Sequence, residues 1–280
     1  MKDFTDKVAV ITGAGSGIGR ALALDLAARG ARLALSDVDD VAVADTAASC
    51  EKLGAQAKGY QLDVADRAAV TGHAEEVAGE YGRVNLVVNN AGVALMSTVE
   101  QMSYRDLDWI VGINFWGVVH GTKAFLPHLI ASGDGHLVNI SSVFGFVGVP
   151  TQSAYNATKF AVRGFTEALR QEMLIDKRPV GVSCVHPGGI RTNIARDARA
   201  PGGDPSEQRA RDFARIARTT PEDAAKTILR GVQRGSPRIL IGPDAYVFDA
   251  MPRILGAGYQ RLTSTGIRLA RRFGVSTGGL

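Results

Sequence analysis

The sequence has only two cysteines, Cys50 and Cys184, in 280 residues. A disulfide-stapled secreted domain needs several cysteine pairs, so we expect free thiols in a reducing compartment. The five histidines share no ligand-like spacing with one another or with the cysteines, which argues against a zinc or iron site. No run approaches the roughly 20 apolar residues of a membrane-spanning helix. The N-terminal residues lack the apolar core of a secretory signal, and together these absences predict a cytoplasmic protein without a metal.

Aromatic residues make up only 6% of the chain, but 45% of all residues are hydrophobic, which predicts one large folded domain or two small ones. Charge is uneven along the sequence. Residues 191–280 carry 16 Lys and Arg against 8 Asp and Glu, whereas residues 1–190 carry 16 against 20. We interpret the basic tail as a solvated face or a subunit contact. The alternative is that it binds an anionic surface. We expect no nucleic acid as a partner.

Short apolar runs alternate with longer helical patterns along most of the chain. Predicted strands comprise residues 7–12, 31–36, 57–62, 85–89, 136–141, 180–185 and 238–241. Predicted helices comprise residues 17–30, 104–132 and 152–176, and a further helix begins after Thr220. Several of the strands are nearly all apolar, as expected when both faces of a sheet are covered. The pattern predicts an α/β fold with a doubly wound parallel sheet of about seven strands and helices on both faces.

Two segments fall outside this alternation. Residues 188–219 have no clear periodicity and contain proline and glycine among charges, so we interpret them as a substrate lid. Residues 244–273 have the apolar spacing of amphipathic helices, interrupted near Pro252 and Gly256–Gly258. The domain prediction is a catalytic domain over 1–243 and a C-terminal helical extension over 244–280. The extension could pack on a neighbouring subunit, cover the substrate mouth or lie on a membrane surface, in that order of preference.

A glycine cluster follows the first predicted strand and opens a helix. It reads Thr-Gly-Ala-Gly-Ser-Gly-Ile-Gly over residues 12–19. Glycines there permit a tight turn and let the backbone approach a pyrophosphate, which binds at the helix N-terminus. A plain strand–helix turn is the alternative, but the placement between a strand and a helix favours a dinucleotide site.

The second predicted strand ends at Ser36 and Asp37. An acid at this position accepts hydrogen bonds from the adenosine ribose and repels a 2′-phosphate. Ser16 and Val38 stand where a basic residue would accommodate that phosphate. We therefore favour NAD as the cofactor, and NADP is the alternative. The alternative role for Asp37 is that of a simple turn residue.

A second constellation follows the fifth predicted strand. Tyr155 and Lys159 are four residues apart in a predicted helix and so project from one face. This spacing alone arises readily by chance. Ser142, however, lies just past a strand end, and the carboxyl ends of strands are where an open parallel sheet binds ligands.

Together these motifs resemble the short-chain dehydrogenase/reductase family, in its single-domain type with TGxxxGxG and YxxxK motifs. The resemblance covers roughly residues 5–243. In family order the matching elements are the glycine loop at 12–19, Asp63, the Asn-Asn-Ala-Gly run at 89–92, Asn114, Ser142, Tyr155 with Lys159, and Pro187-Gly188 followed by Thr192. The resemblance implies a Rossmann-type fold and hydride transfer with a nicotinamide cofactor.

The resemblance also implies roles for four catalytic residues. Tyr155 is the expected general acid and base, with its pKa lowered from about 10 by the Lys159 ammonium and the positive nicotinamide ring. Ser142 is expected to orient the substrate oxygen. Asn114 is expected to hold a water that links Lys159 to solvent, although a buried asparagine bonded to backbone is the alternative.

The remaining expected contacts are with cofactor and substrate. Implied cofactor-binding residues are Gly13, Ser16, Gly17, Ile18, Gly19, Asp37, Asp63, Val64, Asn90, Gly92, Tyr155, Lys159, Pro187, Gly188, Ile190 and Thr192. The apolar run after Ser142 suggests a hydrophobic substrate, contacted by Leu95, Phe144, Val149 and Ile194. In the alternative, Phe144 and Phe146 pack under the 188–219 loop.

We thus expect an NAD-dependent oxidoreductase that interconverts a hydrophobic secondary alcohol and its ketone. The alternative is a catalytically idle NAD-binding scaffold or regulatory protein. Members of the family form their subunit interface from the long helices. In this sequence, the aromatic side chains within residues 104–132 supply apolar surface for such an interface. A homodimer or homotetramer is therefore expected.

Overall fold

The computed structural model describes residues 1–201, 211 and 217–272. Seven parallel strands form one sheet in the order β3-β2-β1-β4-β5-β6-β7. The strands are β1 (Val8–Thr12), β2 (Arg32–Asp37), β3 (Ala57–Gln61), β4 (Leu86–Asn89), β5 (Gly135–Ile140), β6 (Val180–Pro187) and β7 (Arg238–Ile241). The chain winds outward from β1 in one direction and from β4 in the other, which confirms the doubly wound Rossmann-type sheet.

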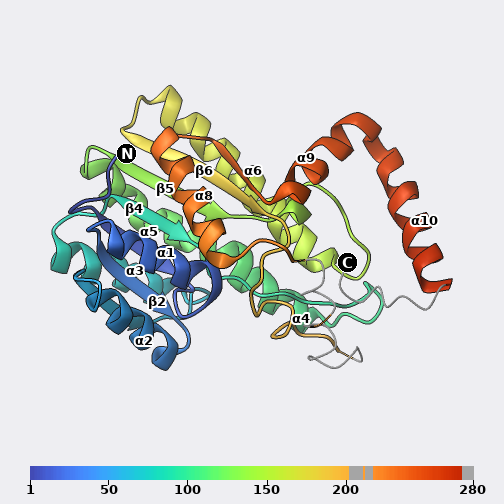
Figure 1. Ribbon diagram of the computed structural model, residues 1–280, viewed down its shortest axis with the longest axis horizontal. Helices are drawn as coiled ribbons and strands as arrows, with labels where there is room; N and C mark the ends of the chain where they lie inside the picture. The colour runs from blue at the N-terminus through green and yellow to red at the C-terminus, as the bar shows by residue number, and fades with distance from the viewer. Residues whose placement is uncertain (202–210, 212–216, 273–280) are drawn as a thin grey trace.

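Helices cover both faces of this sheet (Figure 1). The α-helices are α1 (Gly17–Ala28), α2 (Asp40–Glu51), α3 (Arg67–Tyr81), α4 (Tyr104–Val111), α5 (Gly117–Ala131), α6 (Ser153–Ile175), α8 (Pro221–Arg234), α9 (Pro243–Leu255) and α10 (Tyr259–Arg272). Buried side chains of α1, α2 and α8 form one cluster with the sheet, and those of α3, α5 and α6 form the other.

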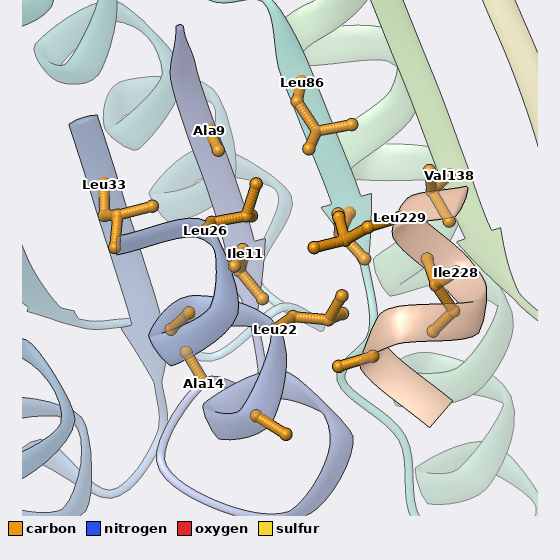
Figure 2. Close-up of a cluster of buried hydrophobic side chains, with 14 of the residues drawn as sticks. Ala9, Ile11, Ala14, Leu22, Leu26, Leu33, Leu86, Val138, Ile228 and Leu229 are labelled. Carbon is orange, nitrogen blue, oxygen red and sulfur yellow. The ribbon is translucent and has the colours of Figure 1, made fainter. Parts of the chain in front are cut away.

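The alternation of side chains along β1 explains the two clusters. Ala9 and Ile11 point to one face, whereas Val8 and Val10 point to the other. On the first face, Leu22 of α1 and Ile228 of α8 lie over Ile11 and its neighbours (Figure 2). Burial of such a side chain contributes about 1.5–3 kcal/mol, so both helix layers are fixed by the apolar strands between them.

Helix starts follow the expected capping chemistry. The Ser103 hydroxyl accepts a hydrogen bond from the Asp106 N–H at 3.1 Å, and the Thr220 hydroxyl accepts one from the Asp223 N–H at 3.1 Å. Pro221 occupies the first turn of α8. Both caps satisfy backbone donors that a helix start leaves without partners.

The prediction of one continuous α-helix over residues 104–132 is wrong in the middle of that range. A π-helical turn, η1 (Gly112–Trp116), separates α4 from α5. Within it, the Asn114 side chain makes two hydrogen bonds with the backbone of Val93, which fix this wider turn against the loop after β4. Such bulges occur often at functional sites, and this one brings Asn114 toward the site described below.

The C-terminal extension consists of α9, a short 3-10 turn η3 (Gly256–Gly258) and α10. The expected break at the glycines is present, but the break expected at Pro252 is wrong, because α9 continues through it to Leu255. Figure 1 shows α10 extending away from the sheet. None of the helices within the described ranges is long and apolar enough to cross a membrane. Residues 202–210 and 212–216 of the expected lid, and residues 273–280 of the extension, lie outside the described residues.

Candidate active site

A cavity of about 820 Å³ lies at the carboxyl ends of the strands. Its wall takes residues from the loops after six strands, including Gly13 after β1, Asp63 after β3 and Ser142 after β5. This is the edge at which a doubly wound sheet binds ligands. The glycine loop lies at one end of the cavity, the cofactor end, and an apolar group of side chains lies at the other, the substrate end.

The glycine loop is held in a shape that side chains would prevent. Gly13 and Gly17 have φ of +64° and +52°, values that favour glycine. A Cβ atom at Gly19 would lie 2.1 Å from the carbonyl oxygen of Gly13. The Asn90 side chain donates hydrogen bonds to the carbonyls of Thr12 and Gly13 at 2.9 and 3.1 Å, which locks the loop to the end of β4.

Asp37 lies at the end of β2 and lines the same part of the cavity. One of its carboxylate oxygens accepts a hydrogen bond from the Gly15 N–H at 2.8 Å, and the other accepts one from the Asp39 N–H at 3.1 Å. Val38 lines the cavity beside it. The carboxylate is therefore fixed in direction, and its negative charge faces the position that a ribose would take.

These features fit a bound dinucleotide. The glycine cradle leaves no room for side chains, and the start of α1 presents backbone N–H groups to a phosphate. The other expected cofactor contacts that line the cavity are Ser16, Ile18, Asp63, Val64, Gly92, Pro187, Gly188, Ile190 and Thr192. Gly19 lies behind this wall, where it allows α1 to approach the loop. The structure thus gathers the expected nucleotide contacts from five separate segments.

Ser142, Tyr155 and Lys159 all line the cavity. The Lys159 Nζ lies 5.5 Å from the centroid of the Tyr155 ring and donates a hydrogen bond to the Ile140 carbonyl at 3.1 Å. Lys159 is 3% exposed, and no carboxylate among the residues with described positions pairs with it. The positive charge is therefore available to the phenol beside it.

Burial dominates the titration of this pair. It raises the pKa of Tyr155 to about 12, while a hydrogen bond with Ser142 acts in the opposite direction. It also lowers the pKa of Lys159 to about 8. The sequence-based prediction of a lowered pKa combines the Lys159 ammonium with the positive charge of a bound nicotinamide ring, so for the cofactor-bound enzyme it stays a prediction. At neutral pH the phenol is protonated and the lysine is mostly charged.

Asn114 is fully buried, and its side chain bonds to protein on both ends. Its oxygen accepts from the Val93 N–H at 2.8 Å, and its amide group donates to the Val93 carbonyl at 2.9 Å and to the Thr158 hydroxyl at 3.3 Å. A Cβ atom at Gly92 would lie 3.3 Å from the Asn114 oxygen and 3.4 Å from the Lys159 Nζ. Asn114 therefore lies close to Lys159. Its contacts in the structure, however, are those of the alternative role, a buried asparagine bonded mainly to backbone.

At the substrate end, the expected residues divide into two groups. Phe144 and Ile194 line the cavity. Leu95 instead packs with Ile110 and Ala154, and Val149 packs against the cluster that contains Phe146. Neither residue is part of the cavity wall: Leu95 is fully buried among its apolar neighbours, and Val149 is half-buried against its cluster.

Sequence reasoning missed several residues of this end. Asp244 and Phe248 of α9 line the cavity. Asp244 accepts a hydrogen bond from the Gly189 N–H at 2.8 Å, and the Phe248 ring lies edge-to-face with Phe144 at 6.3 Å between centroids. Nothing local in the sequence of the tail marks these two positions. Gln152 also lines the cavity, and its position three residues before Tyr155 on the same helix was a signal available in the sequence.

Trp109 of α4 is a further missed residue of the wall. The Arg199 guanidinium lies 3.7 Å from the centroid of its ring and 3.4 Å from an oxygen of Asp106. The backbone of Arg199 also pairs with Leu95 in a short parallel bridge. These contacts fix the loop after β6 against α4 beside the cavity.

The same residues can be compared with known proteins. A family model described as short chain dehydrogenase matches residues 7–202, most of the chain. The chain belongs to this family. Its glycine loop, its Ser142–Tyr155–Lys159 group and its seven-stranded sheet are those of a short-chain dehydrogenase, an oxidoreductase that uses NAD(H) or NADP(H).

Relatives cover nearly the whole chain. A protein of Mycobacterium tuberculosis (strain ATCC 25618 / H37Rv), "Putative oxidoreductase SadH", is 56% identical over 268 residues, which are 95% of this chain and 97% of the relative. A short-chain dehydrogenase/reductase from Burkholderia phymatum, solved in complex with NAD, has a TM-score of 0.85 and 32% identity, and the match covers 91% of this chain and 95% of that one.

An alcohol dehydrogenase from Thermococcus sibiricus, solved with 5-hydroxy-NADP, has a TM-score of 0.72 and 26% identity, and the match covers 84% of this chain and 95% of that one. The solved neighbours therefore include both nicotinamide cofactor types, and the choice between them depends on residues of this chain.

Proposed function

We propose that this short-chain dehydrogenase interconverts a hydrophobic secondary alcohol and its ketone with NAD(H). The observation that carries the proposal is that Ser142, Tyr155 and Lys159 line the same cavity as the large apolar side chains of the substrate end. A proton-transfer group beside a hydrophobic pocket suits a substrate with one reactive oxygen on an apolar body.

In the proposed reaction, Ser142 and Tyr155 hydrogen-bond the substrate oxygen and hold it beside the cofactor end. During oxidation the O–H bond of the alcohol breaks and the Tyr155 oxygen takes the proton, while the carbinol C–H bond gives up its hydrogen with both electrons. During reduction Tyr155 returns a proton to the oxygen. The glycine loop and Asp37 would hold the dinucleotide, whose nicotinamide would supply the hydride chemistry and, in its oxidised form, a positive charge in addition to that of Lys159.

The pKa of Tyr155, raised by burial to about 12, makes the rates of oxidation and reduction depend on pH in opposite ways. A protonated phenol at neutral pH is ready to act as an acid, as reduction requires. Oxidation requires the phenolate, whose fraction grows as the pH rises toward the pKa of the group. We therefore expect oxidation to gain rate with increasing pH and reduction to lose rate once the phenol ionises.

We propose NAD(H) as the preferred cofactor. The carboxylate of Asp37 is held in place by two backbone N–H groups, and its charge opposes a 2′-phosphate. The neighbouring cavity residues Ser16 and Val38 offer no positive charge to a phosphate.

Further parts of the proposal concern assembly and domains. We propose residues 1–243 as the catalytic domain, with α9 of the extension adding Asp244 and Phe248 to its substrate end. Trp116 of η1 and Phe160 of α6 are 49% and 42% exposed and support a homo-oligomeric interface at this surface. A sedimentation mass of a single chain would contradict it.

The buried, unpaired Cys50 and Cys184 fit the reducing cytoplasm that we propose as the location.

The test of the reaction is absorbance at 340 nm with NAD⁺ and 1-phenylethanol, 2-octanol or cyclohexanol. Substitution Tyr155→Phe removes the proton acceptor, and we expect kcat to fall by about 10²–10⁴-fold. NADH affinity, measured by fluorescence titration, should change little because the ring remains.

The matched control is Tyr104→Phe, which removes a hydroxyl from a side chain that is 85% exposed at the start of α4. It should keep full activity. NADH binding without turnover of any alcohol or of the matching ketones would favour the idle scaffold over the enzyme, and full turnover in Tyr155→Phe would remove the proposed acid–base group.

A further inference from the structure

Gln152 is a buried polar residue that the proposed reaction does not use. It is 7% exposed, caps the start of α6 and lines the cavity. Its backbone is bonded, since its N–H donates to the Val149 carbonyl and its carbonyl accepts from the Asn156 N–H. Its side-chain amide makes no hydrogen bond with any residue whose position the structure describes. The atoms of this amide are nevertheless not fully enclosed by protein. The amide therefore faces open space, and the space that Gln152 borders is the cavity.

Asn156, one turn further along α6, shows what a purely structural amide does here. It is 6% exposed, much like Gln152. Its oxygen accepts from the Val149 N–H at 3.0 Å, and its amide group donates to the carbonyls of Phe144 and Val147 at 2.9 and 2.8 Å. A buried amide without such partners costs about 1–3 kcal/mol. The contrast indicates that the partner of Gln152 is a molecule in the cavity.

The backbone before Gln152 holds it in this position. Thr151 has φ of +67°, an unfavourable value for a β-branched residue. Its carbonyl accepts a hydrogen bond from the Ser97 N–H at 2.9 Å, and Ser97 and Gln152 pair in a short parallel bridge. Strained residues of this kind gather at ligand sites, and this one fixes the start of α6 beside the cavity.

The surroundings of Gln152 limit what it can bind. It precedes Tyr155 by three residues, at the N-cap position of α6, and both residues line the same cavity. The substrate end contains the apolar side chains of Met96, Trp109, Phe144 and Phe248, and Asp244 adds a carboxylate. Lys159 is the one basic residue among the described residues that line the cavity. Because no cation other than Lys159 is available there, a neutral amide side chain is better suited to bind an uncharged oxygen of the substrate than a substrate carboxylate.

We propose that Gln152 forms a second polar subsite, which binds an uncharged hydroxyl or carbonyl oxygen of the substrate close to the reacting carbinol. The proposal rests on the proposed function, since Tyr155 marks the reacting oxygen. The substrate class is then a hydrophobic molecule with two neighbouring oxygens, one oxidised or reduced and the other held by the amide. Gln152 is a specificity residue, and it takes no part in proton transfer.

The test compares 1-phenylethanol with 1-phenyl-1,2-ethanediol and 1-phenyl-1,3-propanediol as substrates with NAD⁺. We expect the unmodified enzyme to prefer at least one diol in kcat/KM by about tenfold or more, because an unpaired buried amide penalises the alcohol that lacks the second oxygen. Gln152→Met keeps the length of the side chain but removes its hydrogen bonds. In this variant the preference should disappear, because kcat/KM for the diol falls through a higher KM, whereas kcat/KM for 1-phenylethanol rises once no unpaired amide opposes its binding.

The matched control is Gln171→Met, on the same helix but exposed, where the preference should remain. Thermal unfolding of both variants checks that they fold. An enzyme that oxidises 1-phenylethanol without a preference for either diol, or a Gln152→Met variant that keeps the preference, would overturn the second subsite. Failure of all three alcohols and their ketones to react would instead count against the proposed function.

Discussion

At the cofactor end of the cavity, the molecule presents mainly backbone, whereas at the substrate end it presents side chains. The glycine loop, the start of α1 and the Asn90 hydrogen bonds form a cradle in which an added Cβ would collide with the chain itself. The substrate end is assembled from Met96, Trp109, Phe144 and Phe248, which come from four distant segments. The glycine loop of the cofactor end is therefore intolerant of added side chains, and the substrate end is sensitive to which side chain is present.

Substitution of Gly19 by valine should have the largest effect at the cofactor end. Its Cβ would lie 2.1 Å from the Gly13 carbonyl oxygen, so the loop and α1 must separate. Overpacking of this kind costs about 3 kcal/mol, or about 100-fold in the Kd for NADH. Fluorescence titration with NADH measures it.

The control is Gly79→Ala in α3, where nothing lies within 4 Å of the added carbon. This change should leave NADH binding intact and stabilise the helix by up to about 1 kcal/mol. Unchanged NADH affinity in Gly19→Val would show that the cradle is not the nucleotide site.

An intermediate effect is expected from Asp37→Asn, which removes a charge at the cofactor end but retains an oxygen for the Gly15 N–H. Loss of the repulsion toward a 2′-phosphate should shift the ratio of the NADPH and NADH dissociation constants by about 10–100-fold toward NADPH. Competition titrations with the two cofactors measure this ratio. Asp40→Asn, an exposed neighbour at the start of α2, should shift it little; an equal shift there would point to general electrostatics instead.

The smallest effect is expected from Phe248→Ala at the substrate end. Loss of the ring that faces Phe144 removes about 1.5 kcal/mol of apolar contact, so kcat/KM for a hydrophobic alcohol should fall about tenfold with NADH affinity unchanged. Val247→Ala, on the exposed side of α9, is the control. A change in NADH affinity in Phe248→Ala would mean that the two ends of the cavity are not independent.

The difference between the two ends also explains what the sequence could predict. The strands were predictable, with ends within two residues, because most of them are nearly all apolar runs that demand burial on both faces. The glycine loop and the pair Tyr155 and Lys159 were recognisable because each is contained within eight consecutive residues, so local spacing determines their geometry.

Features that depend on contacts between distant segments were not predictable. The π-helical turn around Asn114 follows from bonds to Val93, 21 residues earlier. The placement of Leu95 depends on Ile110 and Ala154, and the contribution of α9 to the cavity depends on how it packs against the loop after β6. The elevated pKa of Tyr155 likewise follows from burial, which no spacing along the chain reveals.

The contact of Asp244 with the loop after β6 has a consequence for how such enzymes diversify. Its carboxylate joins the Gly189 N–H, and any residue larger than glycine at 188 would collide with it. One carboxylate thus anchors a terminal segment whose next helical turn carries Phe248 into the cavity. Exchange of the segment beyond this anchor between homologues offers a modular route to new substrate preferences, in which nucleotide binding is inherited unchanged.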